Sequence, residues 1–166
     1  MQKQIFITNG MARCGKDTFA EFLDEIVPVL KYSSINKVKK IAELCGWNGG
    51  KTEKDRKFLS DLKMLTTEYS DMAFKDLQEK VKVFHNASLC NVMLIDIREP
   101  EEIERAKKAF GAKTILIIND NVEFIDSNVA DANVYMYKYD YVIDNSSTLE
   151  VFKERVREFA EAHILK

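Results

Sequence analysis

The chain has 166 residues, which corresponds to one ordinary domain. Its hydrophobic content of 46% and aromatic content of 10% suit a globular core and argue against disorder. The 25 basic and 27 acidic residues give a net charge of −2, which argues against a general binder of nucleic acid or of an anionic membrane. No apolar run approaches the roughly 18 residues of a membrane span. Cys14, Cys45 and Cys90 lie far apart, which favours a reduced, cytoplasmic setting.

Short apolar runs alternate with helical patterns along the chain. Strands are expected at residues 4–8, 91–95, 113–118 and 140–143. Helices are expected from about residue 19 to Val27, before Pro28, then at 35–45, twice within 52–84, at 101–110 and after the capping box Ser147-x-x-Glu150. Strands separated by helices predict βαβ units, and therefore an α/β fold with a mainly parallel sheet and helices on both faces.

The sequence also contains two regular side-chain patterns and one stretch without periodicity. The first helix within 52–84 is expected to have an apolar face made of Phe58, Leu59, Leu62 and Leu65. Alternate positions hold Tyr135, Tyr137, Tyr139 and Tyr141, which favours one face of an edge strand over a base-stacking platform. Residues 119–139 lack periodicity, which indicates a functional loop or a misread element.

A phosphate-binding loop follows the first expected strand directly and precedes the first helix. It fits the pattern G-x-x-x-x-G-K and consists of Gly10, Met11, Ala12, Arg13, Cys14, Gly15, Lys16, Asp17 and Thr18. Glycines let such a loop wrap closely, so that backbone N–H groups and the helix N-terminus point at a phosphate. Lys16 is then placed to reach the β- and γ-phosphates of a nucleotide. Strand, loop and helix in this order predict that the chain binds ATP.

Asp17 departs from the usual loop, which has a hydroxyl residue there as a Mg²⁺ ligand. An aspartate beside a triphosphate repels it unless a cation sits between them. Two roles stay open: Asp17 holds Mg²⁺ directly or through water, or it caps the helix and faces away from the phosphates. Thr18 is the nearest hydroxyl.

Three further residues are candidates for the site. Asp96 ends the run 91–95, where P-loop proteins place a second acidic Mg²⁺ site, and we favour a metal or substrate role over an ordinary helix cap. Arg98 lies at the carboxyl end of the same strand, where α/β sheets bind ligands, or it forms a salt bridge with a nearby glutamate. Arg56 lies opposite the apolar stripe of its helix, which by itself indicates a solvated face.

The motif fits a small-molecule kinase better than other P-loop classes. A GTPase would need D-x-x-G and N-K-x-D, but the segment Asn36-Lys37-Val38-Lys39 lacks the aspartate. A transporter-type ATPase or a helicase motor would need a longer chain with further signature loops. A kinase needs a phosphate loop, an acceptor pocket and a closing lid, and 166 residues can supply these.

Several segments, taken in order, resemble the phage and bacterial type of deoxynucleoside monophosphate kinase. Residues 10–18 are similar to that family's x-x-R-S-G-K-D-T loop. Residues 33–41, followed by Gly46-Trp47, resemble its apolar-lysine helix ending in G-W. Further similar segments are 55–59, then 95–102, which is similar to D-x-R-x-x-x-E, and 140–150. The matches cover most of the chain.

The resemblance implies one P-loop kinase domain over residues 1–166, with a three-layer, adenylate-kinase-like fold and a parallel sheet of about five strands. It implies phosphoryl transfer from ATP, with Mg²⁺, to a (deoxy)nucleoside 5′-monophosphate. Partners would be small nucleotides, and the chain a monomer or homodimer. Helices within 34–85 would form the acceptor side, and residues 119–139 a lid.

The resemblance also assigns roles by position. The catalytic residues would be Lys16, Arg13 and Arg98. The acceptor would be bound by Arg56, Asp96, Arg98 and Lys37. The Mg²⁺ ion would be held by Asp17, Thr18 and Asp96.

The expected lid departs from that family's pattern, which carries arginines there. Residues 119–139 contain four acidic residues and a single basic one, Lys138. Acidic side chains cannot spread the charge of a transferring phosphoryl group. Either Arg13 and Arg98 suffice, or the enzyme is slow, or the chain binds nucleotide without turnover. A kinase of another small acceptor, of the dephospho-coenzyme A or phosphomevalonate type, is the further alternative.

Overall fold

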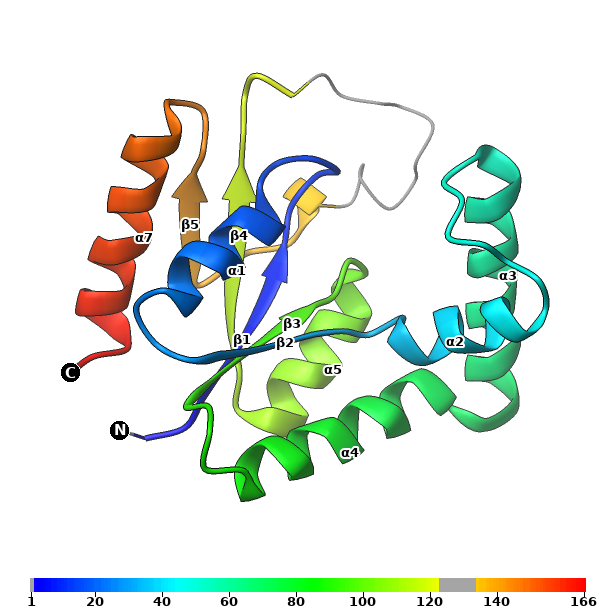
Figure 1. Cartoon of the computed structure of the whole chain (residues 1–166). Coiled ribbons are helices and arrows are strands. Elements are labelled where there is room, and N and C mark those ends of the chain that lie inside the picture. Colours follow the sequence, from blue (N-terminus) through cyan, green and yellow to red (C-terminus); the bar gives the residue numbers. More distant parts are fainter. Residues whose placement is uncertain (1, 123–133) are drawn as a thin grey trace. The chain divides into compact units, whose positions relative to one another are not determined.

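The structure is a computed structural model, and it describes residues 2–122 and 134–166. The chain divides into two compact units. Unit 1 consists of Met1–Tyr32 and Ala87–Lys166 and contains the sheet, whereas unit 2 consists of Ser33–Asn86 and contains three helices (Figure 1). Unit 2 corresponds to residues 34–85, the segment expected to form the acceptor side, and that role stays a prediction.

Unit 1 is built on a five-stranded sheet in the order β2-β3-β1-β4-β5. Its strands are β1 (Gln4–Asn9), β2 (Val29–Ser33), β3 (Val92–Asp96), β4 (Lys113–Ile118) and β5 (Tyr141–Asp144). β1 pairs in parallel with β3 and with β4, in a register that sets Thr8 beside Asp96. The carboxyl ends of β1 and β3 therefore lie together, beside the point where the strand order reverses, which is where open α/β sheets bind ligands.

Helices cover both faces of this sheet (Figure 1). On one face, α1 (Lys16–Asp24) packs against α7 (Leu149–His163). On the other, α5 (Pro100–Phe110) contacts β1 and β4. A short 3-10 turn, η1 (Val134–Met136), precedes β5. The expected three-layer α/β fold with a parallel sheet of about five strands is confirmed.

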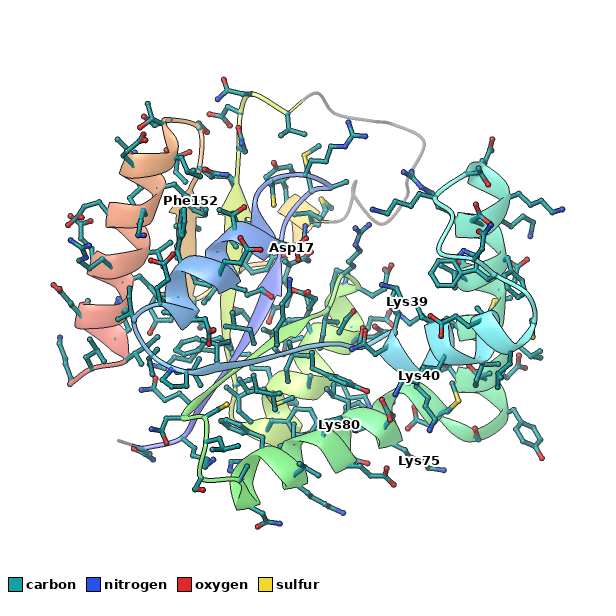
Figure 2. All side chains as sticks on the ribbon, in the orientation of Figure 1. Asp17, Lys39, Lys40, Lys75, Lys80 and Phe152 are labelled. Carbon is teal, nitrogen blue, oxygen red and sulfur yellow. The ribbon has the colours of Figure 1, made fainter. Side chains whose placement is uncertain are left out.

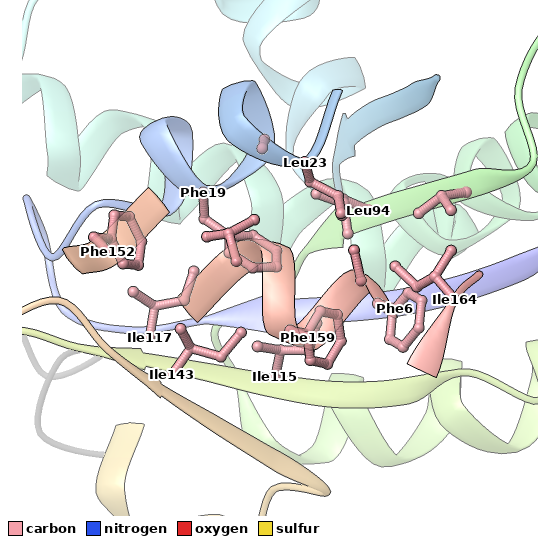
Figure 3. Packing of buried hydrophobic residues seen from close by; sticks show 14 of the residues in the cluster. Phe6, Phe19, Leu23, Leu94, Ile115, Ile117, Ile143, Phe152, Phe159 and Ile164 are labelled. Carbon is pink, nitrogen blue, oxygen red and sulfur yellow. The ribbon is translucent and has the colours of Figure 1, made fainter. Parts of the chain in front are cut away.

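The main core of unit 1 lies between the sheet and the layer formed by α1 and α7 (Figure 3). Phe19 of α1 and Phe152 of α7 are both 0% exposed. The Phe159 ring lies 5.6 Å from the Phe6 ring and 6.0 Å from the Phe19 ring, each edge to face, which is a favourable aromatic geometry. This packing ties β1 to α1, so it fixes both ends of the loop that joins them.

Unit 2 contains α2 (Asn36–Leu44), α3 (Glu53–Ser70) and α4 (Met72–Asn86), which contact one another. α3 begins with a capping box in which Thr52 and Asp55 exchange hydrogen bonds. No residue of α3 is fully buried, and Leu65 is 63% exposed, so the expectation that it belongs to an apolar face was wrong. Within unit 2 the neighbours of α3 are α2 and α4, and two helices do not cover the whole stripe.

Besides shifts of one residue at the ends of other elements, unit 1 differs from expectation at three places. β2 was not predicted, since its five residues are all half-buried and show no clear alternation. α1 ends at Asp24 instead of continuing to Val27, whose N–H still donates to the Leu23 carbonyl as a last turn before Pro28. α7 has Thr148 as its N-cap, with the Thr148 hydroxyl accepting from the Val151 N–H, so the capping box expected at Ser147 was wrong.

The four alternating tyrosines do not form one strand face. Tyr135 lies in η1, and β5 begins only at Tyr141. The start of pairing is set by Asp140, whose carboxylate accepts from the Thr114 N–H at 2.8 Å and from the Thr114 hydroxyl at 2.9 Å. Period two over this segment therefore does not reflect strand geometry. Among the described residues, no helix has the length and apolar character needed to cross a membrane.

Replacing Phe19 by alanine should lower the free energy of unfolding by about 3–5 kcal/mol, because its loss leaves a cavity in a fully buried region. Urea denaturation followed by circular dichroism measures the change. Phe22→Ala in the same helix is the matched control, since Phe22 is only partly buried at the border of the same core, and its loss should cost less. Equal losses in the two variants would contradict this assignment of the core.

Candidate functional site

The loop of residues 10–15 joins β1 to α1 and turns sharply back on itself. Gly10 and Gly15 have φ angles of +148° and +104°. A Cβ atom on Gly10 would lie 2.4 Å from the Ile117 carbonyl oxygen, and one on Gly15 would lie 2.3 Å from Nδ2 of Asn145. Space and backbone conformation therefore both require glycine at position 10, and the positive φ angle favours glycine at position 15.

Lys16 folds its side chain back over this loop. Its ammonium donates hydrogen bonds of 2.7 Å to the carbonyl oxygens of Gly10 and Met11, and it lies 3.6 Å from Sγ of Cys14. At the start of α1 the N-cap residue is Gly15, which has no side chain to cap the first N–H groups. A lysine charge and an uncapped helix N-terminus at one loop are the features that bind a phosphate.

The middle of the loop is anchored in the core. Cys14 is 1% exposed, and its carbonyl accepts a 2.9 Å hydrogen bond from Nδ2 of Asn145. The Asn145 N–H in turn donates to the Ile118 carbonyl at the end of β4. Burial raises the pKa of the Cys14 thiol, although the nearby Lys16 lowers it. Cys14 therefore packs as a neutral side chain, and Asn145, which the sequence analysis did not single out, holds the loop against the sheet.

Two of the three predicted metal ligands lie near one lysine that was not predicted. Asp96, at the end of β3, accepts a hydrogen bond from the Thr8 hydroxyl. Asp17 lies in the first turn of α1 (Figure 2), and its side chain is 88% exposed. Lys31 of β2 forms an ion pair with Asp17, and its Nζ lies 3.7 Å from Oδ2 of Asp96. Asp17, Asp96 and Lys31 are hereafter called the acidic edge.

The charge of Lys31 is favoured by these contacts. Burial of its side chain lowers its pKa, but the hydrogen bond to Asp17 and the charge of Asp96 outweigh that effect and raise the pKa above the ordinary lysine value. Lys31 is therefore a permanent cation at the acidic edge. The third predicted metal ligand, Thr18, lies on α1 next to Asp17 and is half-buried.

A buried asparagine connects the loop to two other segments. Asn9 ends β1 and is 1% exposed. Its Oδ1 accepts from the Gly10 N–H at 2.8 Å, while its Nδ2 donates to the Arg98 carbonyl at 3.1 Å and to the Tyr139 hydroxyl at 2.7 Å. The Tyr139 hydroxyl donates onward to the Val134 carbonyl at 2.9 Å. Burial raises the pKa of Tyr139 to about 12, against the Asn9 hydrogen bond, which lowers it. Tyr139 therefore remains a donor at neutral pH.

Arg98 lies where the sequence analysis placed it, two residues beyond the end of β3 and half-buried. Its carbonyl is held by Asn9, so its backbone has a fixed position relative to Gly10. Arg13, the other predicted catalytic arginine, is exposed in the loop and has a φ angle of +65°.

Lys37 and Arg56 lie in unit 2, both exposed, near the start of α2 and of α3 respectively. Unit 2 has 11 basic and 8 acidic residues, a net charge of +3. Lys39 and Lys40 of α2 and Lys75 and Lys80 of α4 are labelled in Figure 2. The roles of Lys37 and Arg56 in holding an acceptor stay predictions, which the positive charge of unit 2 supports.

The expected lid, residues 119–139, falls largely on residues 123–133, outside the described residues. Its two ends are described. The Asp120 N–H donates to the Ser146 hydroxyl at 2.9 Å, and the Asn121 side chain donates to the Ser146 carbonyl at 2.8 Å. At the other end, Tyr139 is bonded to Asn9. Both ends are thus attached next to the phosphate loop.

No protein-family model and no curated protein sequence matches the chain. Its fold is similar to those of several solved kinases. A dephospho-CoA kinase from Campylobacter jejuni is 17% identical with a TM-score of 0.56, over 96% of this chain and 97% of that one. A sugar kinase from Janibacter is 11% identical with a TM-score of 0.55, over 98% and 96%. A shikimate kinase from Aquifex aeolicus is 15% identical with a TM-score of 0.53, over 98% and 99%. The chain therefore has the fold of P-loop kinases.

Replacing Tyr139 by phenylalanine should lower the free energy of unfolding by about 1–3 kcal/mol, because buried Asn9 and the Val134 carbonyl each lose a hydrogen-bond partner. Tyr137→Phe is the matched control, since its hydroxyl donates to Glu104 in an exposed contact and should cost less. Urea titrations of both variants provide the comparison. If the two variants prove equally stable, the Asn9 connection does not hold the loop.

Proposed function

We propose that the chain is an ATP- and Mg²⁺-dependent kinase that phosphorylates a (deoxy)nucleoside 5′-monophosphate. The observation that carries the proposal is the loop of residues 10–15: its two glycines, the lysine folded over its carbonyls and the uncapped start of α1. This loop lies at the carboxyl ends of β1 and β3, in a fold shared with solved kinases.

Lys16 would neutralise the phosphates of the nucleotide. Its ammonium would exchange two carbonyl acceptors for phosphate oxygens, which are stronger acceptors because they are charged. Arg13 would bind the phosphoryl group being transferred, and Arg98 would hold the phosphate of the acceptor. Phosphoryl transfer requires mainly positioning and charge neutralisation, which these side chains supply.

The two carboxylates of the acidic edge, together with Thr18, fit Mg²⁺ as oxygen ligands. Mg²⁺ is usually held by one or two carboxylates together with phosphates and water, and Asp17, Thr18 and Asp96 offer this set. Among the described residues, no group of three or more His, Cys, Asp or Glu side chains forms an all-protein metal cage, which agrees with a metal shared with the substrate. When bound, Mg²⁺ would supply positive charge between the phosphates.

The contacts of Asp96 support a phosphate acceptor over a hydroxyl acceptor. A hydroxyl acceptor needs a general base, whereas a phosphate monoester is already largely anionic at neutral pH. Asp96 is the obvious base, but one of its oxygens accepts from Thr8 and the other faces Lys31. Arg56 and Lys37, on the positively charged unit 2, would bind the acceptor. We place this activity in the cytoplasm, in a monomer or homodimer acting on small nucleotides.

Lys16→Met should weaken binding of ATP by about 1.5–3 kcal/mol, because it removes a charged contact with the phosphates. Isothermal titration calorimetry of the parent chain and the variant measures the loss. Lys153→Met is the matched control: Lys153 pairs with Glu25 on the surface, away from the loop, and binding should be unchanged. A parent chain that binds no ATP at millimolar concentration contradicts the proposal.

The acceptor is identified by the release of ADP from Mg-ATP with nucleoside monophosphates, dephospho-coenzyme A or phosphomevalonate as second substrate. With the active acceptor, Arg98→Ala should raise KM for the acceptor more than KM for ATP, since Arg98 would bind the acceptor. Its melting temperature is measured alongside, and the hydrogen bond from Asn9 to the Arg98 backbone carbonyl is kept in this variant. ATP binding without turnover of any acceptor would favour a nucleotide-binding module, and a response only to dephospho-coenzyme A or phosphomevalonate would favour another small acceptor.

A further inference from the structure

Lys31 occupies the place between the carboxylates that we expect to hold a metal. It comes from β2, the strand next to β3, and its ammonium hydrogen-bonds Asp17 and lies 3.7 Å from Oδ2 of Asp96. The Lys31 side chain is 32% exposed and that of Asp96 is 24% exposed, so their contact is partly shielded from water. The second oxygen of Asp96 is directed to Thr8. One ammonium therefore serves two carboxylates from two different elements.

We propose that Lys31 is a built-in counter-ion that holds the divalent-cation position in the nucleotide-free chain and is displaced when Mg²⁺ binds with the nucleotide. The inference rests on the proposed function, which supplies the metal and the nucleotide. Lys31 lowers the affinity of that site for free Mg²⁺. Mg²⁺ therefore binds there more tightly when the phosphates of a nucleotide are bound with it.

The charge balance of the acidic edge gives the reason. Asp17 and Asp96 both need a nearby cation, because two carboxylates facing one site repel each other. Lys31 provides one positive charge without any metal. A divalent cation that enters must take the same carboxylate oxygens and tolerate the Lys31 charge beside it, so its affinity is reduced. A bound nucleotide adds several negative charges, which attract a divalent cation strongly enough to displace the Lys31 ammonium from the carboxylates.

The structure allows Lys31 to leave without a change of fold. Its contacts are made by the ammonium at the end of a four-carbon stem, which has many rotamers. Its partner Asp17 is 88% exposed, so the shared hydrogen bond is open to water and to competing ions. β2 itself is held by its place beside β3. Displacement thus requires only a side-chain rotation, and metal binding and nucleotide binding become coupled through it.

The first test measures Mn²⁺, as a probe for Mg²⁺, binding to the nucleotide-free chain by electron paramagnetic resonance. Lys31→Met should bind Mn²⁺ roughly two- to fivefold more tightly than the parent, the range expected for loss of a partly exposed ion pair. Lys31→Arg keeps the charge and should stay near the parent, and Lys153→Met, which removes a remote surface pair, should not differ from it. Equal Mn²⁺ binding by Lys31→Met and the parent, including no binding by either, overturns the proposal.

The second test needs no variant and so does not depend on how Lys31→Met folds. The rate at which an amine-reactive reagent acetylates Lys31 in the parent chain is followed by mass spectrometry, with Lys153 as the internal control. Adding Mn²⁺ alone should speed acetylation of Lys31 severalfold and leave Lys153 unchanged. Unchanged reactivity of Lys31 at saturating Mn²⁺ overturns the proposal.

The two proposals fail in different ways. The Mn²⁺ experiments contain no nucleotide, so they report on Lys31 whether or not the chain is a kinase. If ATP does not bind at all, the proposed function is lost while the Mn²⁺ results still decide the role of Lys31. If ATP binds but Lys31→Met has parent-like Mn²⁺ affinity, the kinase assignment stands and the counter-ion does not.

Discussion

The close approach of the loop after β1 to the neighbouring strand β4 is the constraint on which the site depends. At Gly10 the backbone passes so near the Ile117 carbonyl that a Cβ would lie 2.4 Å from it. The chain can follow this path only without a side chain and with a positive φ angle. Asn145, from the end of β5, then holds the Cys14 carbonyl, so the loop is fixed against β4 and β5 together. The aromatic core beneath α1 fixes its other end.

With the loop fixed, the cations of the site are held by internal partners. Lys16 is held by two carbonyl oxygens of its own loop, and Lys31 is held by two carboxylates. The partners differ in kind: neutral carbonyls release Lys16 readily to a charged phosphate, whereas carboxylates retain Lys31 until a stronger cation arrives. The two lysines thus prepare one site for an anion and for a divalent cation respectively. Lys16 and Lys31 each carry one positive charge, so their different roles come from their different hydrogen-bond partners.

The sequence predicted well what depends on local pattern and poorly what depends on pairing across the sheet. The loop could be found because its glycines and lysine are required at fixed spacing, and β3 because a strand buried on both faces is a continuous apolar run. Asn9 follows such a run just as Asp96 does, so the same rule would have found it. Lys31 could not be found, because its half-buried edge strand has no pattern. The period-two tyrosines were misleading, because Asp140 and Thr114 determine where β5 begins.

The net charge of the chain is the sum of two units whose net charges have opposite signs. A net charge of −2 led the sequence analysis to set aside polyanionic partners, yet unit 2 carries +3 and unit 1, with 14 basic and 19 acidic residues, carries −5. A nucleotide phosphate that binds the loop of unit 1 therefore meets a negative background, and its attraction must come from Lys16 and the helix N-terminus at short range. Water and salt screen the remote charges within about 10 Å, whereas contacts inside the loop are screened much less. The specific geometry of the loop, and not the net charge, decides whether this chain binds an anion. Local geometry is decisive for cations as well. The negative charge of unit 1 attracts Mg²⁺, but the Lys31 ammonium at the acidic edge weakens this attraction.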